Sequence, residues 1–424
     1  MGFVIEGRGL KLSLLKKISM TAGVVLAAGT LVATEAAATE GYFQNALGAR
    51  SKGMAGAGVA NSKDATAITL NPAGLVHAGR QFNGSVSLFM PFRSYSAGAG
   101  AGGVVPGSQK SKRNIFAVPN MAYSQPINDT TTFGVSLSGN GGMNTTYKNG
   151  AGPFGGGTTG IDLTQVNISA GFGKQLGKYF SFGVAPIFAI QRFKARGLGA
   201  FDNAIASANP GSVTNRGYDY SVGGGVRFGV EFQLDENIRV GASYQSKLLM
   251  SRFKKYSGLF AENGDFDIPS NFQVGVAFDV TPDLTLMVDY RYINYSEIAA
   301  ISNPNPLGQL GASNGSGFGW VDVQTIKFGA EYQATDDLTV RAGYAYNTGA
   351  IPKSQVAFNI LAPATVRHHV TAGATYKFSA NSDVEFAAMF APSVSITGPT
   401  SPGGQLTTIK MHQVEFTVGY NYRW

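Results

Sequence analysis

From about residue 80 to its last residue, this chain alternates between apolar and polar side chains with a period of two. In residues 414–424, Val, Phe, Tyr and Trp occupy the even positions, whereas polar residues and one glycine occupy the odd ones. Similar alternation recurs in residues 284–292, 326–332 and 338–346. Because successive side chains of a β-strand point to opposite faces, the pattern predicts many strands, each with one apolar and one polar face.

Short turn motifs punctuate these strands at intervals of about 45 to 58 residues. Each motif contains Asp, Asn, Gly or Pro, which supply tight-turn chemistry. The six motifs are residues 126–129, 176–178, 234–237, 281–283, 335–337 and 380–383. They close six hairpins with long loops at the opposite ends. One strand before them (residues 80–95) and one after them (residues 406–424) raise the predicted count to fourteen.

An even number of antiparallel strands with tight turns at one end and long loops at the other is typical of an outer-membrane β-barrel. Closure of the sheet satisfies every backbone amide inside the lipid. Tyrosines and Trp424 gather near strand ends, where a membrane interface favours aromatic side chains. A large soluble β-sandwich is the alternative. We predict an all-β fold, a 14-stranded antiparallel transmembrane barrel over residues 80–424.

The first 38 residues have the order of a secretory signal peptide. Four basic residues precede an apolar stretch at residues 18–32, and the alanines at 36–38 offer a cleavage site. An uncleaved membrane anchor is the alternative, but the stretch has about 15 residues where a spanning helix needs about 20. The mature chain is therefore expected outside the cytoplasm.

Composition excludes several functions. The chain has 424 residues, no cysteine and a formal net charge of +8. The lack of cysteine rules out disulfides, thiolate metal sites and cysteine nucleophiles. The basic residues are scattered singly, which argues against nucleic acid as a partner. His368 and His369 are adjacent on a predicted strand and point to opposite faces, a poor metal pair, so we expect no metal and no cofactor.

Charged residues of the predicted strands fall on the inward face. Inside a barrel they would meet water or pair with one another, and we expect pairing that stiffens the wall as their main role. A few of them are expected to contact cargo. These residues are Arg239, Asp279, Asp289, Arg291, Lys327, Glu331, Arg341, Lys377, Glu385 and Glu415.

Residues 39–79 do not alternate, and they are far longer than a tether to the first strand requires. Their middle, residues 53–60, is rich in Ala and Gly and poor in charge. A wide barrel must be filled to prevent leakage, so we predict that this segment is a hatch, or plug, inside the lumen. A free periplasmic leader is the alternative.

Five motifs along the mature chain match the pattern of one known family. They are Gly41-Tyr42-Phe43, the small-residue run 53–58, Asn71-Pro72-Ala73-Gly74, the turn at 126–129 and the aromatic C-terminal residue Trp424. Together they resemble the FadL/TodX-type outer-membrane transporters of long-chain fatty acids and aromatic hydrocarbons. The resemblance implies a monomeric barrel whose hatch gates the lumen, and a Trp424 that the barrel assembly machinery recognises.

The same resemblance implies that substrate leaves sideways through a gap at a kinked third strand. In this chain that strand begins near Thr131 and runs into Asn140, Gly141 and Gly142. Glycine inside a strand weakens pairing and permits a bulge. The residues alone are equally compatible with an ordinary strand end that enters a loop. The family favours the gap.

Two loops carry apolar residues suited to substrate capture. Leu198, Phe201 and Ile205 are spaced by three and four residues, which predicts one face of a short helix. Leu259 and Phe260 stand in the next long loop. Exposed apolar clusters on a secreted surface need a reason. A landing site for a lipid tail is one, and packing of the loops against each other is the alternative.

Pro186 interrupts the strand expected over residues 180–195, and a proline inside a sheet usually marks a bulge. Without a bulge, Arg192 has outward parity, whereas a one-residue bulge would turn it into the lumen. The family resemblance implies a basic residue of the inner pocket here, which would pair with a carboxylate head group. The alternative is an outward Arg192 that binds lipopolysaccharide phosphates together with Lys194 and Arg196.

The resulting function hypothesis is passive uptake of hydrophobic small molecules, long-chain fatty acids first, across the outer membrane of a Gram-negative bacterium. An aromatic hydrocarbon channel is the alternative, and a general diffusion porin and an outer-membrane lipase are more remote ones. We expect no enzymatic activity, because the few histidines have no evident serine and acidic residue as catalytic partners. The expected partners are the substrate, outer-membrane lipid, lipopolysaccharide and the assembly machinery.

Overall fold

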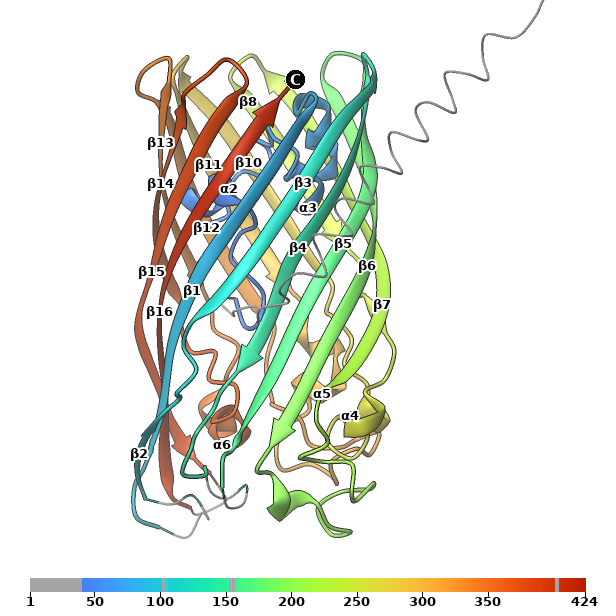
Figure 1. The fold of residues 1–424 in the computed structure, drawn as a ribbon, viewed down its shortest axis with the longest axis vertical. Helices are drawn as coiled ribbons and strands as arrows, with labels where there is room; N and C mark the ends of the chain where they lie inside the picture. Colours follow the sequence, from blue (N-terminus) through green and yellow to red (C-terminus); the bar gives the residue numbers. More distant parts are fainter. Residues whose placement is uncertain (1–39, 101–103, 105, 152–153, 155–156, 401–403) are drawn as a thin grey trace, which may run out of the picture.

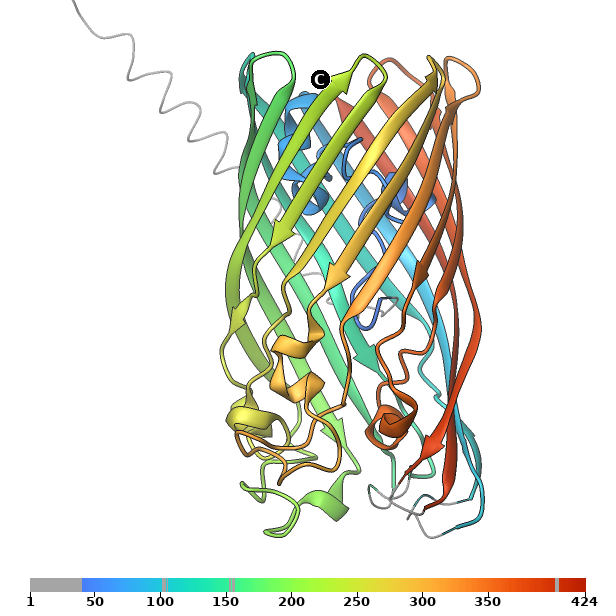
Figure 2. The ribbon, with the colours of Figure 1, turned by 180° about the vertical axis from the view of Figure 1, so that it is seen from behind.

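A computed structural model describes residues 40–424 except residues 101–103, 105, 152–153, 155–156 and 401–403. The predicted signal peptide, residues 1–38, lies outside the described residues. The described chain forms a closed antiparallel barrel (Figures 1 and 2). No helix in this part of the chain is long and apolar enough to cross a membrane.

Fourteen long strands form the wall. They are β1 (Gln81–Ala97), β3 (Phe116–Asn128), β4 (Thr131–Asn144), β5 (Gly160–Leu176), β6 (Phe180–Arg196), β7 (Asp219–Asp235), β8 (Ile238–Gln245), β10 (Asn271–Thr281), β11 (Leu284–Ile293), β12 (Val323–Gln333), β13 (Leu338–Asn347), β14 (His368–Lys377), β15 (Ser382–Pro399) and β16 (Leu406–Arg423). Two short strands, β2 (Gly107–Lys110) and β9 (Leu249–Met250), pair with β1 and β7. Each long strand pairs with its neighbour in sequence, and β16 pairs with β1 to close the barrel. The predicted count of fourteen is confirmed.

The connections differ at the two ends of the barrel. The six predicted turn motifs join the strands from β3–β4 to β14–β15 at the end where the chain terminates, at the top of Figure 1. The long loops lie at the other end. They carry η2 (Gly199–Phe201), η3 (Lys254–Tyr256), α4 (Ala261–Gly264), η4 (Tyr295–Glu297), α5 (Ala299–Ser302), η5 (Lys353–Gln355) and α6 (Val356–Asn359).

The two faces of the wall carry opposite chemistry. On the outer face, apolar side chains are open, as at Phe386 (51% exposed), Phe416 (52%) and Val418 (55%). On the inner face, polar and charged residues such as Lys327 and Gln413 are fully buried. An apolar outer surface is favourable in lipid and costs ~25 cal/mol per Å² in water. This arrangement confirms the predicted alternation and excludes a soluble sandwich, which would bury its apolar face.

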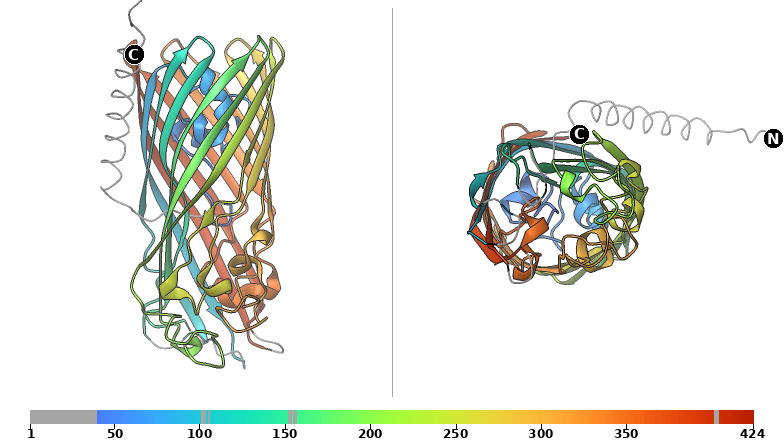
Figure 3. Two further views of the ribbon diagram at one scale, coloured as in Figure 1. Left: turned by 90° about the vertical axis from the view of Figure 1, so that its right-hand side faces the viewer. Right: turned by 90° about the horizontal axis from the view of Figure 1, so that it is seen from below.

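Residues 40–79, here called the luminal segment, lie inside the barrel (Figure 3). The segment contains α2 (Ala49–Gly53), α3 (Ala67–Leu70) and η1 (Pro72–His77). The helix α2 packs against β13 to β16, and η1 packs against β4 to β7. Most of the segment is buried, so it does not extend from the barrel as a free leader.

Inward-facing glycines of the wall make room for the luminal segment. A Cβ at Gly183 would lie 2.3 Å from the carbonyl carbon of Pro72, and one at Gly229 would lie 2.0 Å from Asn71 Oδ1. On the opposite side of the barrel, a Cβ at Gly343 would lie 2.3 Å from the carbonyl carbon of Met54. The high glycine content of the strands therefore has a steric cause, because the backbone of the segment lies directly on the wall.

Candidate functional site

An apolar pocket lies among the long loops. Its empty volume is about 440 Å³, and no charged side chain lines it. Six phenylalanines contribute to the lining: Phe154, Phe193, Phe201, Phe260, Phe318 and Phe358. The rings of Phe154, Phe201 and Phe358 contact one another. Phe193 contacts Phe260, with ring centroids 4.7 Å apart. Such a pocket can hold an alkyl chain or an aromatic ring but offers no charged group to a head group.

The structure places four of the five predicted capture residues in the loop pocket and one outside it. Leu198, Phe201, Leu259 and Phe260 all line the loop pocket, although they come from different loops. Ile205 does not line it and is 90% exposed. The predicted helix is wrong in extent, because η2 covers a single turn, Gly199–Phe201, and the chain turns away before Ile205.

An aromatic cluster lies next to the loop pocket, because two of its rings contact the pocket residues Phe260 and Phe318. Tyr42 stacks on Phe43 at 5.3 Å and contacts Tyr295 at 5.3 Å, Trp320 at 5.9 Å and Phe266 at 6.2 Å. All five side chains are buried. Burial raises the pKa of the Tyr42 hydroxyl well above its ordinary value, so this hydroxyl is neutral. We call this buried group of rings inside the barrel the aromatic barrier.

Backbone contacts fix the first residues of the luminal segment. Gly41 has a φ of 71°, and a Cβ there would lie 2.3 Å from the Tyr295 hydroxyl, so only glycine fits without a shift. The Tyr42 N–H donates to the Tyr295 hydroxyl at 3.0 Å, and this hydroxyl donates to the Glu40 carbonyl oxygen at 2.6 Å. The predicted motif Gly41-Tyr42-Phe43 thus lies at the centre of the barrier.

Two wall cations hold the Glu40 side chain. Lys327 Nζ lies 2.8 Å from Glu40 Oε1, and Arg291 Nη1 lies 2.9 Å from Glu40 Oε2. Lys327 and Glu40 are fully buried. Because a buried charge without a partner is costly, this pairing ties the start of the segment to β11 and β12. The sequence reasoning missed Glu40, although the inward parity of its two partners was predicted.

A bulge in β4 lies against these first residues. The register between β4 and β5 shifts at Gly139/Gly141. Gly142 N–H donates to the Tyr42 carbonyl oxygen at 3.0 Å, and Gln44 N–H donates to the Asn140 carbonyl oxygen at 3.1 Å. The predicted residues Asn140, Gly141 and Gly142 therefore form a bulge that pairs with the luminal segment.

The ladder between β3 and β4 ends early. Its last pair is Asn120↔Ser138, whereas β1 and β3 stay paired as far as Phe89↔Phe116. Beyond Ser138, β4 leaves its neighbour and follows the luminal segment. A pocket with an empty volume of about 350 Å³ lies beside this gap, and Phe89, Phe116 and Gly142 line it. The wall is thus discontinuous where the sequence predicted a weak strand.

The motif Asn71-Pro72-Ala73 docks the other end of the luminal segment. Asn71 Nδ2 donates to the Val59 carbonyl oxygen at 2.7 Å and to the Val230 carbonyl oxygen at 3.1 Å. Asn71 Oδ1 accepts from the Ala73 N–H at 3.1 Å, which caps η1. All three residues are fully buried or nearly so. One side chain thus joins the segment to itself and to β7.

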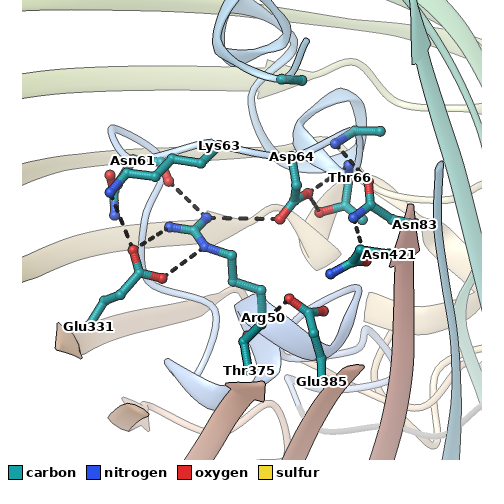
Figure 4. A network of polar contacts seen from close by, with 12 residues as sticks. Arg50, Asn61, Lys63, Asp64, Thr66, Asn83, Glu331, Thr375, Glu385 and Asn421 are labelled. Carbon is teal, nitrogen blue, oxygen red and sulfur yellow. Dashed lines mark hydrogen bonds and ion pairs between the residues drawn. The ribbon is translucent and has the colours of Figure 1, made fainter. Parts of the chain in front are cut away.

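The inward charges pair mainly with the luminal segment near the turn end (Figure 4). Arg50 donates to both oxygens of Glu331 at 2.9 Å, and Arg341 Nε lies 2.7 Å from Glu331 Oε2. Burial opposes the charge of Arg50, but Glu331 outweighs it and holds the pKa of Arg50 above its ordinary value. Lys52 pairs in the same way with Glu415. The expected pairing across the wall occurs, but with a third partner inside the barrel.

Arg192 does not turn into the lumen. The register between β6 and β7 is continuous from Phe180 to Phe193, and pairing with β5 resumes unchanged on both sides of Pro186. The expected bulge is therefore absent, because the proline faces outward and loses ladder bonds without adding a residue. The Arg192 guanidinium lies over the Tyr218 ring at 4.4 Å. This geometry does not support the predicted head-group role in the lumen.

Comparisons with known proteins agree with this architecture. A sequence model of the family described as "Outer membrane protein transport protein (OMPP1/FadL/TodX)" matches residues 29–424. The chain belongs to this family. The family consists of transporters and channels of the outer membrane rather than enzymes, so this chain is an outer-membrane transport protein for hydrophobic substrates.

Two curated relatives and two solved structures illustrate the range of the family. The long-chain fatty acid transport protein of Escherichia coli K12 is 25% identical over 91% of this chain and 95% of its own. Outer membrane protein P1 of Haemophilus influenzae is 25% identical over 72% of each chain. The P. putida toluene transporter TodX and a Pseudomonas aeruginosa FadL homologue each superpose with a TM-score of 0.70, at 18% and 17% identity. Each alignment covers 90% of this chain and 99% of the other chain. These two structures share the fold.

Several residues of this site gave no local signal in the sequence. Tyr295 and Trp320 reach the barrier from loops that no periodicity describes. Glu40 meets Lys327 across 287 residues of chain, as the numbering shows. The glycines at inward strand positions were the one signal available, because a small residue where the lumen faces the wall indicates close backbone packing.

Proposed function

We propose that this chain takes up hydrophobic small molecules, with long-chain fatty acids as the first substrate class, by a route through three sites. The loop pocket captures the apolar part of the molecule, the luminal segment gates passage, and the gap between β3 and β4 releases the molecule sideways into the membrane. Burial of an alkyl chain offers ~0.8 kcal/mol per methylene, so capture needs no elaborate hydrogen bonding.

The observation that carries this proposal is the place of Tyr42. Its ring contacts Phe266 and Trp320, which adjoin the loop pocket through Phe260 and Phe318. Its carbonyl oxygen accepts from Gly142 in the β4 bulge. One residue of the gate thus contacts both the entry and the exit, and its displacement would connect them.

The substrate class follows from the relatives. The curated relatives with the highest coverage are named long-chain fatty acid transport proteins, whereas the solved structures include a toluene transporter. The uncharged loop pocket accepts either molecule. We therefore keep aromatic hydrocarbons as the second candidate class.

Growth of a deletion strain on a single carbon source tests the substrate class. We expect the strain to lose growth on oleate, to regain it with the intact chain, and to keep growth on acetate. Loss of growth on toluene with normal growth on oleate would favour the second class. Unchanged growth on both would contradict the proposed function.

We also propose a monomer with two further partners. Trp424 is 54% exposed and lies over Arg80 at 4.8 Å, so its ring is open to the assembly machinery at the turn end. Arg192 and Lys194 lie on the outer face of β6, near the loop end, where lipopolysaccharide phosphates would meet them. The barrel is closed by β16 and β1, so no strand edge calls for a second copy.

A further inference from the structure

The gap between β3 and β4 is closed again at its loop end. Its turn end is the ladder pair Asn120↔Ser138. Farther along, Lys112 N–H donates to the Thr146 carbonyl oxygen at 2.9 Å, and Thr146 N–H donates to Ser111 Oγ at 3.1 Å. Lys112 lies eight residues before Asn120, and Thr146 lies eight residues after Ser138, so the two chains meet again in the register they left. The gap is therefore a window that is closed at both ends.

The two edges of this window are residues 113–119 and 139–145. The first edge runs beside β1, which pairs with β3 before the window ends and with β2 beyond it. The second edge runs beside β5, and their pairing continues as far as Asn144↔Asp162. Because each edge is held by its own neighbour, the window can widen only where the edges bow apart between its two closed ends.

Arg93 of β1 joins the two edges near the loop end. Its guanidinium donates to the carbonyl oxygen of Asn144 on one edge and to that of Arg113 on the other. Arg93 is 6% exposed. The planar guanidinium presents its donors in a fixed fork, so one side chain can hold two backbone groups at once. Arg93 thus bridges the edges where the ladder is missing.

An ion pair on the outer face makes a second connection. Arg113 Nη1, on the first edge, lies 3.6 Å from Asp162 Oδ2 on β5. The same carboxylate oxygen accepts from the Tyr218 hydroxyl at 2.7 Å. Because the Arg113 side chain is 47% exposed, we expect this connection to be weaker than that of Arg93.

Both arginines also contact Phe116, which lies on the first edge. Their guanidinium carbons lie over its ring, at 5.5 Å for Arg93 and 5.8 Å for Arg113. Phe116 is 3% exposed and lines the pocket of about 350 Å³ beside the window. The two cations that join the edges therefore also hold the ring that lines the passage.

We propose that Arg93, Arg113 and Phe116 limit the width of the molecule that leaves through the window, and so select unbranched chains over branched ones. This inference rests on the proposed release through the gap, and it adds the shape of the substrate. A window closed at both ends is a slit along the strands. An unbranched chain can lie along such a slit, whereas methyl branches widen a chain at several points.

A disulfide tests the geometry of the window. Lys112→Cys together with Thr146→Cys places two thiols at opposite positions, at a spacing that a disulfide can bridge. We expect an oxidant to cross-link the purified full chain, and palmitate uptake by cells to be the same with the bond formed or reduced. Failure to cross-link, or uptake that returns only on reduction, would show that this end of the window is open or must open. Either result would overturn the inference.

Initial uptake of palmitate and phytanate tests the selection. The two acids share a head group and a main chain, but only phytanate carries methyl branches. With the unaltered chain, we expect phytanate uptake to be slower by about tenfold, the scale on which a closed apolar site discriminates a methyl group. Arg93→Met should narrow the difference to about threefold and keep palmitate uptake. Arg113→Gln should act in the same direction but less.

The matched control is Lys410→Met. Lys410 is an exposed cation of β16 that lies opposite Ser94, so it is at the level of Arg93 but on the outer face. This variant should leave the uptake ratio unchanged. Heat-modifiable migration on a gel reports folding, and the exposed Arg113 keeps the test open if Arg93→Met does not fold.

Two results of the uptake experiment would overturn the inference and leave the transport proposal standing. One is equal uptake of both acids by the unaltered chain, and the other is an unchanged ratio in the folded arginine variants. A deletion strain that takes up both acids as fast as the complemented strain would instead remove the proposed function, and the inference with it.

Discussion

Gly141 is a wall residue that lies directly against the backbone of the luminal segment. A Cβ there would lie 2.0 Å from the Tyr42 carbonyl oxygen, and its φ lies outside the left-handed region, so the constraint is one of space. Gly141→Val should push the β4 bulge away from Tyr42 and open the lumen. We expect cells with this variant to become sensitive to vancomycin.

The matched control is Gly199→Ala, because a Cβ at this loop glycine meets nothing within 4 Å. Cells with this variant should stay resistant. If a folded Gly141→Val barrel kept the resistance of the unaltered chain, the contact at Gly141 would have no part in closing the lumen.

Glu40 tests the electrostatic anchor of the luminal segment. Glu40→Gln leaves Lys327 and Arg291 without their carboxylate, and breaking a buried pair on one side typically costs ~3–5 kcal/mol. We expect faster hydrogen exchange at residues 41–60. The control, Asp336→Asn, removes an exposed carboxylate in the β12–β13 turn and should leave exchange unchanged. Equal exchange in both variants would refute the anchor.

The shifted pKa of Asp265 predicts that the stability of its loop, which contacts the aromatic barrier through Phe266, depends on pH. Burial, with help from Asp267 and Glu262, raises its pKa from 3.8 to about 6. A raised carboxyl pKa means that the folded loop binds the proton more tightly than the unfolded one. Its contribution is therefore complete below pH 3.8 and is lost as the pH rises through 6.

We expect hydrogen exchange around Phe266, corrected for its intrinsic pH dependence, to be slower at pH 3.8 than above pH 6. Asp265→Asn should remove the difference, because an amide does not titrate. A difference that persists in this variant would assign the effect to another group.

At the scale of elements, the early end of the ladder between β3 and β4 leads to a specific prediction. The chain has no cysteine, so introduced cysteines can test this prediction without interference. Ala122 and Ser136 are directly paired, at a spacing that a disulfide can bridge. Val118 and Asn140 would be the next pair but one beyond Asn120↔Ser138 if the ladder continued, and it does not. We expect an oxidant to cross-link cysteines at 122 and 136 but not at 118 and 140.

Equal cross-linking of both cysteine pairs in the ligand-free protein would show that the ladder continues and that the wall has no gap. Mass spectrometry of the oxidised barrels distinguishes the two results. The paired positions serve as the control for export, folding and oxidation.

The elements also show what the sequence could and could not predict. Strands and turns followed from local patterns, because parity and turn chemistry act over a few residues, and all six turns lie where the motifs placed them. The expected bulge that would turn Arg192 into the lumen was wrong, because Pro186 interrupts pairing without inserting a residue. No local pattern distinguishes a proline that makes a bulge from one that does not. The prediction that Ile205 shares a helix face with Phe201 was wrong. The spacing of four residues fits a helix, but the observed helix ends at Phe201.

The site was predictable only where a motif was local. Asn71-Pro72-Ala73 stood out as a motif shared with the family and lies against the wall. The charges at inward parity were found, but their partners in the luminal segment were not, because a pair such as Lys52 and Glu415 is formed by the closed fold. The alternation within strands was enough to predict the wall, whereas no local sequence pattern predicted the path of residues 40–79.

At the scale of the whole molecule, the chain is a barrel with an apolar exterior, and residues 40–79 lie inside its lumen. Buried pairs hold the luminal segment on several sides, from Glu40 with Lys327 to Arg50 with Glu331. Polar groups thus anchor the segment, while the Tyr42 cluster packs as a buried group of aromatic rings. In the proposed route, a molecule in the loop pocket reaches the gap only when that cluster moves.

Ion conductance across a planar lipid bilayer tests this claim most directly. The purified chain should insert and show no steady conductance, whereas the same chain without residues 40–79, exported and heat-modifiable, should conduct steadily. Steady ion flow through the intact chain, equal to that of the shortened one, would contradict the account.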